Sequence, residues 1–320
     1  MVRSTLSSGS WPTLARPGSP WFWRQILTLG TFHHSGPRLL SGYGLCYIWP
    51  MFERYLALWN LLPDGDPLVT SSARLLPVMR GGKPAMLKIS HEKDERSGAL
   101  MEWWDTEGAA QVLARDDEAL LLERATSSAS LVEMARSGRD DEACRILCAT
   151  AARLHAPRPK PYPRAIPLGL WFRDLEPAAA AHGGILVRCA DAARALLAEP
   201  REVGVLHGDL HHGNVLNFGA RGWLAIDPKC LFGERSFDFA NIFTNPDLAD
   251  PEHPVATIPA RFERRLDIVT AAAGLQRRRL LSWILAWAGL SAAWFSDDGD
   301  DTLATIDLQV AALAAAELDR

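Results

Sequence analysis

The sequence predicts an α+β fold in two lobes, a small β-rich lobe over residues 51–125 and a larger, mostly helical lobe over residues 126–320. Short apolar runs separated by turn residues dominate the first part, as expected for strands. Helical periodicity and Ala-rich stretches dominate the second part. The length of 320 residues is sufficient for two packed lobes or for one large domain.

Residues 1–50 differ from the rest of the chain. They are rich in Ser, Pro, Gly, Trp and His, and they contain no Asp or Glu. A secretory signal fits poorly, because Arg24 interrupts the apolar stretch and no clean cleavage site follows. We expect a disordered extension or a misassigned start, with Met51 as the functional start.

Overall composition restricts the possible partners and the compartment. A net charge of −4 favours no nucleic-acid partner, which would require a basic patch. The five cysteines are scattered and odd in number, which favours a reducing compartment, and we expect a cytoplasmic monomer. The most apolar stretch, residues 280–295, is shorter than a membrane span, so it predicts a buried core helix and no membrane partner.

In the first lobe, turn residues at 63–67 precede two strand-like runs within residues 68–79, which are separated by Ser71 and Ser72. No Gly-rich phosphate loop is present, so Ser71 and Ser72 are the candidates for binding nucleotide phosphates through backbone N–H groups and hydroxyls. Residues 80–84, RGGKP, predict a hairpin loop that leads into a strand over residues 85–89.

That strand carries Lys88 on an otherwise apolar run. Enzymes that transfer phosphoryl groups from ATP use a strand lysine of this kind to bind the α- and β-phosphates, with an acidic partner on the following helix. Residues 92–104 are helix-like, and Glu95 is our choice of partner, with Glu92 and Glu102 as alternatives. A lone strand lysine is a weak signal, and it gains weight from the motif that follows later in the chain.

Residues 119–125 form an apolar run that becomes polar abruptly at Glu123, Arg124 and Ala125. In a two-lobed ATP-dependent enzyme, a hinge at this position binds the adenine edge through backbone groups. An ordinary buried edge strand is the alternative from this stretch alone.

The second lobe begins with helices. Apolar positions between residues 139 and 154 recur at helical spacing, a Pro-rich connector follows, and residues 170–198 predict one or two further helices. Residues 203–206, VGVL, then predict a short strand that leads into the central motif.

The central motif is the stretch 207–214, HGDLHHGN, followed by an apolar strand that ends in Asp227. The spacing H-x-D-x-x-x-x-N suits phosphoryl transfer from ATP. Asp209 would take the proton of the acceptor hydroxyl, while Asn214 and Asp227 would hold Mg²⁺. Three nearby histidines leave a zinc hydrolase as an alternative, but the glycines of the loop disfavour a helical zinc motif. Hard oxygen ligands suit Mg²⁺.

Residues 205–243, VLHGDLHHGNVLNFGARGWLAIDPKCLFGERSFDFANIF, resemble the aminoglycoside phosphotransferases, and within them the streptomycin 6-kinase branch that includes hydroxyurea phosphotransferases. The resemblance runs from about residue 55 to the C-terminus and includes PAMLK, DDEACRILCATAARLHAP and LLSWILAWAGLSAAWF. It implies a bilobal protein-kinase-like fold, with ATP and Mg²⁺ as cofactors. It also implies an aminoglycoside substrate, streptomycin at its 6-position, and a role in antibiotic resistance.

The acceptor site is less well defined. Streptomycin carries guanidinium groups, which carboxylates bind in fork-like pairs. Asp297 and Asp298, with Asp300 and Asp301 close by, are the candidates in the second lobe. The alternative is a solvated acidic loop with the N-cap of the final helix. Asp238 is expected to cap a helix or to hold the catalytic loop. A kinase of another small hydroxyl compound and a non-catalytic ATP-binding module also remain open.

Overall fold

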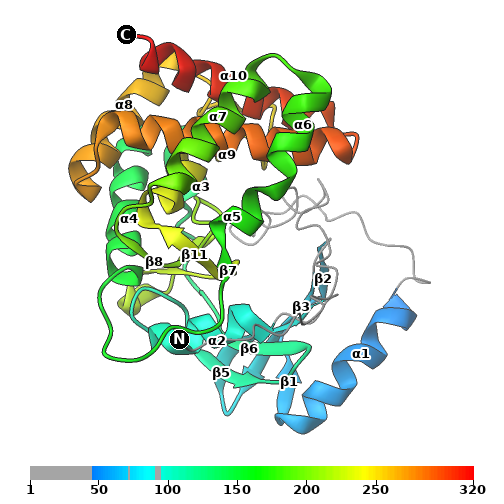
Figure 1. The fold of residues 1–320 in the computed structure, drawn as a ribbon. Helices are drawn as coiled ribbons and strands as arrows, with labels where there is room; N and C mark the ends of the chain where they lie inside the picture. The colour runs from blue at the N-terminus through cyan, green and yellow to red at the C-terminus, as the bar shows by residue number, and fades with distance from the viewer. Residues whose placement is uncertain (1–44, 71–72, 91–94) are drawn as a thin grey trace, which may run out of the picture.

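The structure is a computed structural model that describes residues 45–70, 73–90 and 95–320, with the side chains of 45–48 and 95 left out. It has a sheet-rich N-terminal lobe and a larger helical lobe, which lie at opposite ends of the molecule (Figure 1). Most of the residues assigned to the N-terminal extension lie outside the described residues. Helix α1 (Leu45–Leu58) nevertheless begins before Met51, so the last residues of that segment lie in a helix.

The first lobe is built on an antiparallel sheet with the strand order β1-β3-β4-β6-β5, and β2 pairs with β3 outside this path. The strands are β1 (Leu61–Pro63), β2 (Leu68–Val69), β3 (Ala73–Arg80), β4 (Lys83–Ser90), β5 (Val112–Arg115) and β6 (Ala119–Glu123). The predicted hairpin joins β3 to β4, with Arg80 opposite Lys83. Gly81 and Gly82 both have positive φ, as a tight two-residue hairpin turn requires.

Two hydrophobic cores hold the first lobe. Phe52 and Tyr55 of α1 pack on the alternating inward residues of the sheet, such as Leu76 and Leu87. The buried apolar side chains of α2 (Glu95–Trp104) belong instead to the hydrophobic core that the second lobe forms. The two lobes are therefore joined by buried apolar contacts as well as by the chain.

The second lobe consists mainly of helices, and its long helix α9 is buried along most of its length. The predicted helix over residues 139–154 is confirmed as α4 (Asp140–Leu154). The helices of this lobe are α3 (Leu131–Met134), α4, α5 (Leu168–Trp171), α6 (Leu175–His182), α7 (Ile185–Ala198), α8 (Pro259–Ala273), α9 (Arg277–Asp297) and α10 (Asp301–Leu318). Short η segments are η3 (Ala135–Arg139), η4 (Phe172–Asp174), η5 (Gly219–Arg221) and η6 (Arg235–Phe243). None of the described helices is long and apolar enough to span a membrane.

Two small sheets in the second lobe carry the central motif. One has the order β7-β11-β8, with β7 (Ile166–Pro167), β8 (Val203–Leu206) and β11 (Leu231–Glu234). The other is the hairpin of β9 (Val215–Asn217) and β10 (Trp223–Ala225). The motif lies between β8 and β9, as its position after the predicted strand required. An isolated parallel bridge joins Ala109 to Ala225, which places the hairpin against the first lobe.

Candidate active site

The loop 207–214 bends sharply as it leaves β8, and Gly208 makes this bend possible. Its φ is 81°, in the left-handed region that favours glycine. A Cβ at this position would lie 2.6 Å from Cγ of Leu231 and 3.2 Å from Cβ of Lys229. The strand and loop that follow Asp227 therefore pack directly against the backbone at Gly208.

Asp238 contacts the loop 207–214, which confirms the prediction that this residue reaches back to hold the loop. Its carboxylate accepts hydrogen bonds from the N–H groups of His207 (2.9 Å) and Gly208 (2.7 Å). His155, at the end of α4, donates from Nε2 to the same carboxylate over 2.8 Å. Burial opposes ionisation of Asp238, but the hydrogen bond and charge of His155 hold its pKa below the usual range. The backbone of the loop is therefore fixed by three charge-assisted hydrogen bonds.

His207 orients the loop and does not bind a metal. Its Nδ1 accepts from the N–H of Asp209 (3.2 Å), and its Nε2 donates to the carbonyl of Ile226 (2.9 Å). The ring is fully buried and stacks on Trp104. Burial lowers the pKa of His207, in keeping with a neutral ring that has one donor and one acceptor nitrogen.

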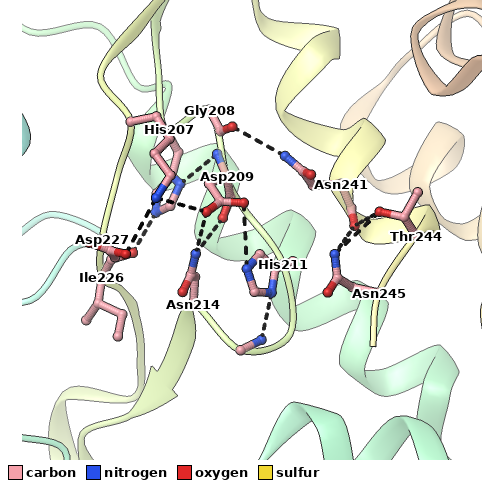
Figure 2. A network of polar contacts seen from close by, with 12 residues as sticks. His207, Gly208, Asp209, His211, Asn214, Ile226, Asp227, Asn241, Thr244 and Asn245 are labelled. Atoms are coloured by element: carbon pink, nitrogen blue, oxygen red, sulfur yellow. Dashed lines mark hydrogen bonds and ion pairs between the residues drawn. The ribbon is translucent and has the colours of Figure 1, made fainter. Parts of the chain in front are cut away.

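Asp209 and Asn214 lie together in the buried part of the loop (Figure 2). Nδ2 of Asn214 donates to the backbone carbonyl of Asp209 (2.9 Å) and to its Oδ2 (3.2 Å). Burial raises the pKa of Asp209, and Lys229 acts in the opposite direction. The amide of Asn214 thus fixes the carboxylate predicted to act as the base.

Asp227 connects the two lobes. Its Oδ1 forms an ion pair with Nζ of Lys88, which the sheet of the first lobe presents. Burial disfavours the charged form of Asp227, but the ammonium groups of Lys88 and Lys229 outweigh this and hold its pKa below the ordinary value. Asp227 has a φ of 59°, in the left-handed region, and it lies two residues after the end of β10.

The residues present fit a magnesium ion. Oδ1 of Asn214 is buried without a hydrogen-bond partner, although the amide nitrogen of the same side chain is fully used. A buried carbonyl oxygen without a donor is a suitable cation ligand, and Asp227 supplies a carboxylate nearby. Among the described residues, no group of three or more His, Cys, Asp or Glu side chains is arranged to hold a metal ion.

The structure brings two further residues to the site: Lys229, which the sequence did not indicate, and His211, which the sequence placed in the motif without a role. Nζ of Lys229 lies 3.3 Å from Oδ2 of Asp209 and 3.6 Å from Oδ2 of Asp227. Nε2 of His211 lies 3.7 Å from Oδ1 of Asp209. Their closeness in sequence to Asp227 and Asp209 was visible, but a position in a loop does not reveal where a side chain points.

The predicted adenine-binding stretch 123–125 begins at Glu123, the last residue of β6. The side chain of Glu123 forms an ion pair with Arg221, which belongs to the second lobe. Arg124 forms an ion pair with Asp64. Both side chains are therefore used in protein contacts, and binding of adenine by the backbone of this stretch remains a prediction.

The partner of Lys88 on the following helix also remains a prediction. The side chain of Glu95 and the whole of Glu92, Ser71 and Ser72 lie outside the described residues. Glu102, the remaining alternative, forms an ion pair with Arg115. The described partner of Lys88 is Asp227.

The acidic segment after α9 has the features of the structural alternative. Asp297 and Asp298 are exposed at the end of α9, and Asp298 is its C-cap. Asp300 caps α10 by accepting from the N–H of Leu303 (3.1 Å). Substrate binding by Asp297 and Asp298 remains a prediction.

The chain is similar to proteins of one known family. A family model described as aminoglycoside/hydroxyurea antibiotic resistance kinase matches residues 58–299. The chain belongs to this family. A streptomycin 3''-kinase from Klebsiella pneumoniae is 58% identical over 82% of this kinase and 99% of the relative. A streptomycin 6-kinase from Streptomyces glaucescens is 30% identical over 79% of the chain and 84% of the relative.

Solved structures confirm the fold. A thermostable variant of an aminoglycoside phosphotransferase, solved in a ternary complex with AMP-PNP and hygromycin B, superposes with a TM-score of 0.58. The match covers 84% of this chain and 99% of that chain at 14% identity. At this identity the likeness concerns the fold alone, and it confirms the predicted protein-kinase-like α+β architecture. The roles proposed for the site residues are argued from the geometry of this chain alone.

Proposed function

We propose that this kinase transfers the γ-phosphoryl group of ATP to a hydroxyl group of streptomycin and thereby confers resistance. The observation that carries the proposal is the convergence of Lys88, Asp209, Asn214 and Asp227 at one place between the lobes. These are the residue types that ATP-dependent phosphoryl transfer requires, and they come from both lobes. The streptomycin kinases among the relatives favour the acceptor.

Asp209 is proposed as the general base. Its carboxylate would accept the proton of the attacking hydroxyl as the new oxygen–phosphorus bond forms. The bond from the γ-phosphorus to the bridging oxygen breaks, and its electron pair leaves with ADP. Asn214 positions Asp209 through one hydrogen bond to its backbone carbonyl and one to its carboxylate, so that the base does not need to reorganise when the acceptor binds.

Asn214 and Asp227 are proposed to hold Mg²⁺, which would neutralise charge on the nucleotide phosphates. Lys88 would bind the α- and β-phosphates, with Glu95 as its helix partner and with Ser71 and Ser72 near the phosphates. The backbone at 123–125 would bind adenine. Exposed Asp297 and Asp298 are kept as candidate contacts for the guanidinium groups of the acceptor.

The position of phosphorylation separates two versions of this proposal. The sequence resemblance favours the 6-hydroxyl, whereas the 58% identity to a 3''-kinase across nearly its full length favours the 3''-hydroxyl. Relatives that act at position 6 are about half as similar. We therefore propose 3'' as the position and keep 6 as the alternative.

The experiment is ADP release by the purified protein with Mg-ATP and a panel of acceptors that includes streptomycin, other aminoglycosides and hydroxyurea. Release with streptomycin is expected, and phosphorus–proton correlation NMR of the product then identifies the modified ring. No release with any acceptor would contradict the kinase proposal. Release with hydroxyurea alone would support the kinase activity but would contradict streptomycin as the acceptor.

The setting of the activity is part of the proposal. ATP is available in the cytoplasm, and the four cysteines whose side chains the structure describes are buried free thiols. We propose a cytoplasmic monomer. Light scattering coupled to size-exclusion chromatography tests the monomer, and a mass of twice the chain would contradict it.

A further inference from the structure

We propose that Lys229 is a catalytic residue that contacts the transferred phosphoryl group and stabilises its charge during transfer. This inference rests on the proposed function, because it assigns one more residue to the same reaction. Four features of the structure support it: the position of the ammonium group, the anchoring of its backbone, the division of the carboxylate oxygens of Asp227, and the position of the nearby His211.

The ammonium group of Lys229 lies between the carboxylates of Asp209 and Asp227. Its Nζ is 3.3 Å from Oδ2 of Asp209 and 3.6 Å from Oδ2 of Asp227. The base must contact the acceptor hydroxyl, and the phosphorus must approach that same hydroxyl oxygen. A cation within hydrogen-bonding reach of the base is therefore within reach of the equatorial oxygens of the group in transfer.

The backbone holds Lys229 in this position. Its N–H donates to the carbonyl of His207 over 2.7 Å, which ties it to the start of the catalytic loop. Its Cβ lies close to Gly208, since a Cβ added at Gly208 would be only 3.2 Å from it. Asp227 and Cys230 on either side have positive φ, so the segment turns twice within four residues. A lysine fixed at its backbone requires little reorganisation to act.

The two lysines divide the carboxylate of Asp227 between them. Lys88 contacts Oδ1 from the first lobe, whereas Lys229 lies near Oδ2 from the second lobe. In the part of the chain that the structure describes, Lys229 also forms an ion pair with Asp209, whereas the ion pair of Lys88 is with Asp227 alone. Lys88 is thus placed for the nucleotide, and Lys229 is placed for the side where the acceptor and the phosphoryl group meet.

His211 lies on the other side of the base. Its Nδ1 accepts from the N–H of Gly213 (3.1 Å), and its Nε2 is 3.7 Å from Oδ1 of Asp209. Lys229 approaches the other carboxylate oxygen, Oδ2. The lysine is therefore the cationic side chain beside the oxygen that lies toward Asp227.

In the step in which Lys229 acts, each bond that forms is matched by a bond that breaks. The acceptor hydroxyl gives its proton to Asp209, the acceptor oxygen bonds to the γ-phosphorus, and the bond to the bridging oxygen breaks with its electrons retained by ADP. Negative charge is carried by the three equatorial oxygens throughout. The ammonium group remains protonated and contributes by electrostatic attraction alone.

The test compares Lys229→Met and Lys229→Arg with the wild type, with Lys83→Met as a matched control. Lys83 is exposed at the hairpin turn of the first lobe, at the start of the strand that carries Lys88. Lys229→Met is expected to lower kcat by about 100-fold, as for loss of one charge-stabilising donor. The KM for ATP and the Kd for ADP should change little. Lys229→Arg should recover part of kcat, and Lys83→Met should match the wild type.

A sulfur substitution on the nucleotide provides a second readout. Sulfur at a non-bridging γ position weakens a contact to an ammonium group, so ATPγS should slow the wild type more than it slows Lys229→Met. If Lys229 only balances the charge of the two aspartates, both proteins will be slowed equally, and the proposal is wrong. It is also wrong if Lys229→Met keeps kcat within about threefold. An inactive wild type would instead contradict the proposed function itself.

Discussion

Nε2 of His155 lies 2.8 Å from Oδ2 of Asp238, although the two residues are 83 positions apart in the chain. The same carboxylate accepts hydrogen bonds from two consecutive backbone N–H groups of the catalytic loop. The end of helix α4 is thus linked through Asp238 to the loop that carries Asp209, the proposed base. This makes His155 and Asp238 positioning residues for Asp209.

Replacing His155 with Ala should therefore lower kcat by about 10-fold with little change in the KM for ATP, because the loop is less firmly held while the nucleotide contacts persist. His155→Gln, which can still donate, should recover much of the loss. Steady-state kinetics measures both values. His182→Ala, at the exposed end of α6, is the control. A change in KM with kcat unaltered would contradict the positioning role.

Arg265 and Asp140 form a fully buried ion pair between helices α8 and α4, and each side chain is 1% exposed. Arg265 also donates to two backbone carbonyls. Arg265→Met should lower the free energy of unfolding by about 3–5 kcal/mol, because it leaves an unpaired buried carboxylate. Urea denaturation measures this change.

The adjacent pair Arg264–Asp141 joins the same two helices but is 53% and 33% exposed. It provides a matched control, since Arg264→Met should cost no more than about 1 kcal/mol. Equal losses for the two variants would show that burial does not determine the contribution of the pair.

Local sequence patterns were sufficient to predict much of the fold. The strand over residues 203–206, the RGGK hairpin and the helix over residues 139–154 all follow from short-range signals such as turn glycines and apolar period. The motif residues Asp209 and Asn214 were also visible, because their spacing of five positions is local. These features depend on residues close together in sequence.

Long-range contacts were not predictable from one sequence. The approach of Lys229 to Asp209 depends on two left-handed residues and on the missing side chain of Gly208. His155 is recognisable only once α4 is placed beside the catalytic loop. Similarly, the sequence does not reveal that Glu123, at the predicted hinge, forms an ion pair with Arg221. Such contacts arise from the packing of the lobes.

Asp307 predicts a pH-dependent stability. It is buried where α10 packs on α9, near Ser291, and burial raises its pKa well above the ordinary value. A carboxyl group whose folded pKa is raised contributes its stability fully below the unfolded pKa of 3.8, and this contribution is lost as the pH rises toward the folded pKa. The stability that Asp307 contributes should therefore decrease as the pH rises from 3.8 toward the folded pKa, and it should stay constant above the folded pKa.

Asp307→Asn removes this titration while keeping the shape of the side chain. Its melting temperature relative to the wild type should rise between pH 5 and pH 8, by an amount equivalent to about 1.4 kcal/mol for each pH unit that lies below the folded pKa. Asp66→Asn, in an exposed loop, is the control. A difference in melting temperature that is independent of pH would contradict the prediction.

Asn214 predicts a changed metal requirement. Its Oδ1 has no hydrogen-bond partner and is proposed as a ligand of Mg²⁺. Asn214→Ala should raise the Mg²⁺ concentration for half-maximal activity by about 10-fold or more, as expected for loss of one direct ligand. A titration of activity with Mg²⁺ at saturating ATP measures this value. An unchanged midpoint with a lower kcat would mean that Asn214 only positions Asp209.

The most direct test of the account is the turnover of Asp209→Asn with Mg-ATP and streptomycin. The variant keeps the shape of the side chain and removes its ability to accept the proton, so kcat should fall by at least about 100-fold. Binding of ADP and of streptomycin, measured by calorimetry, should remain close to the wild-type values. Near-normal turnover by this variant would show that the loop 207–214 does not carry the base.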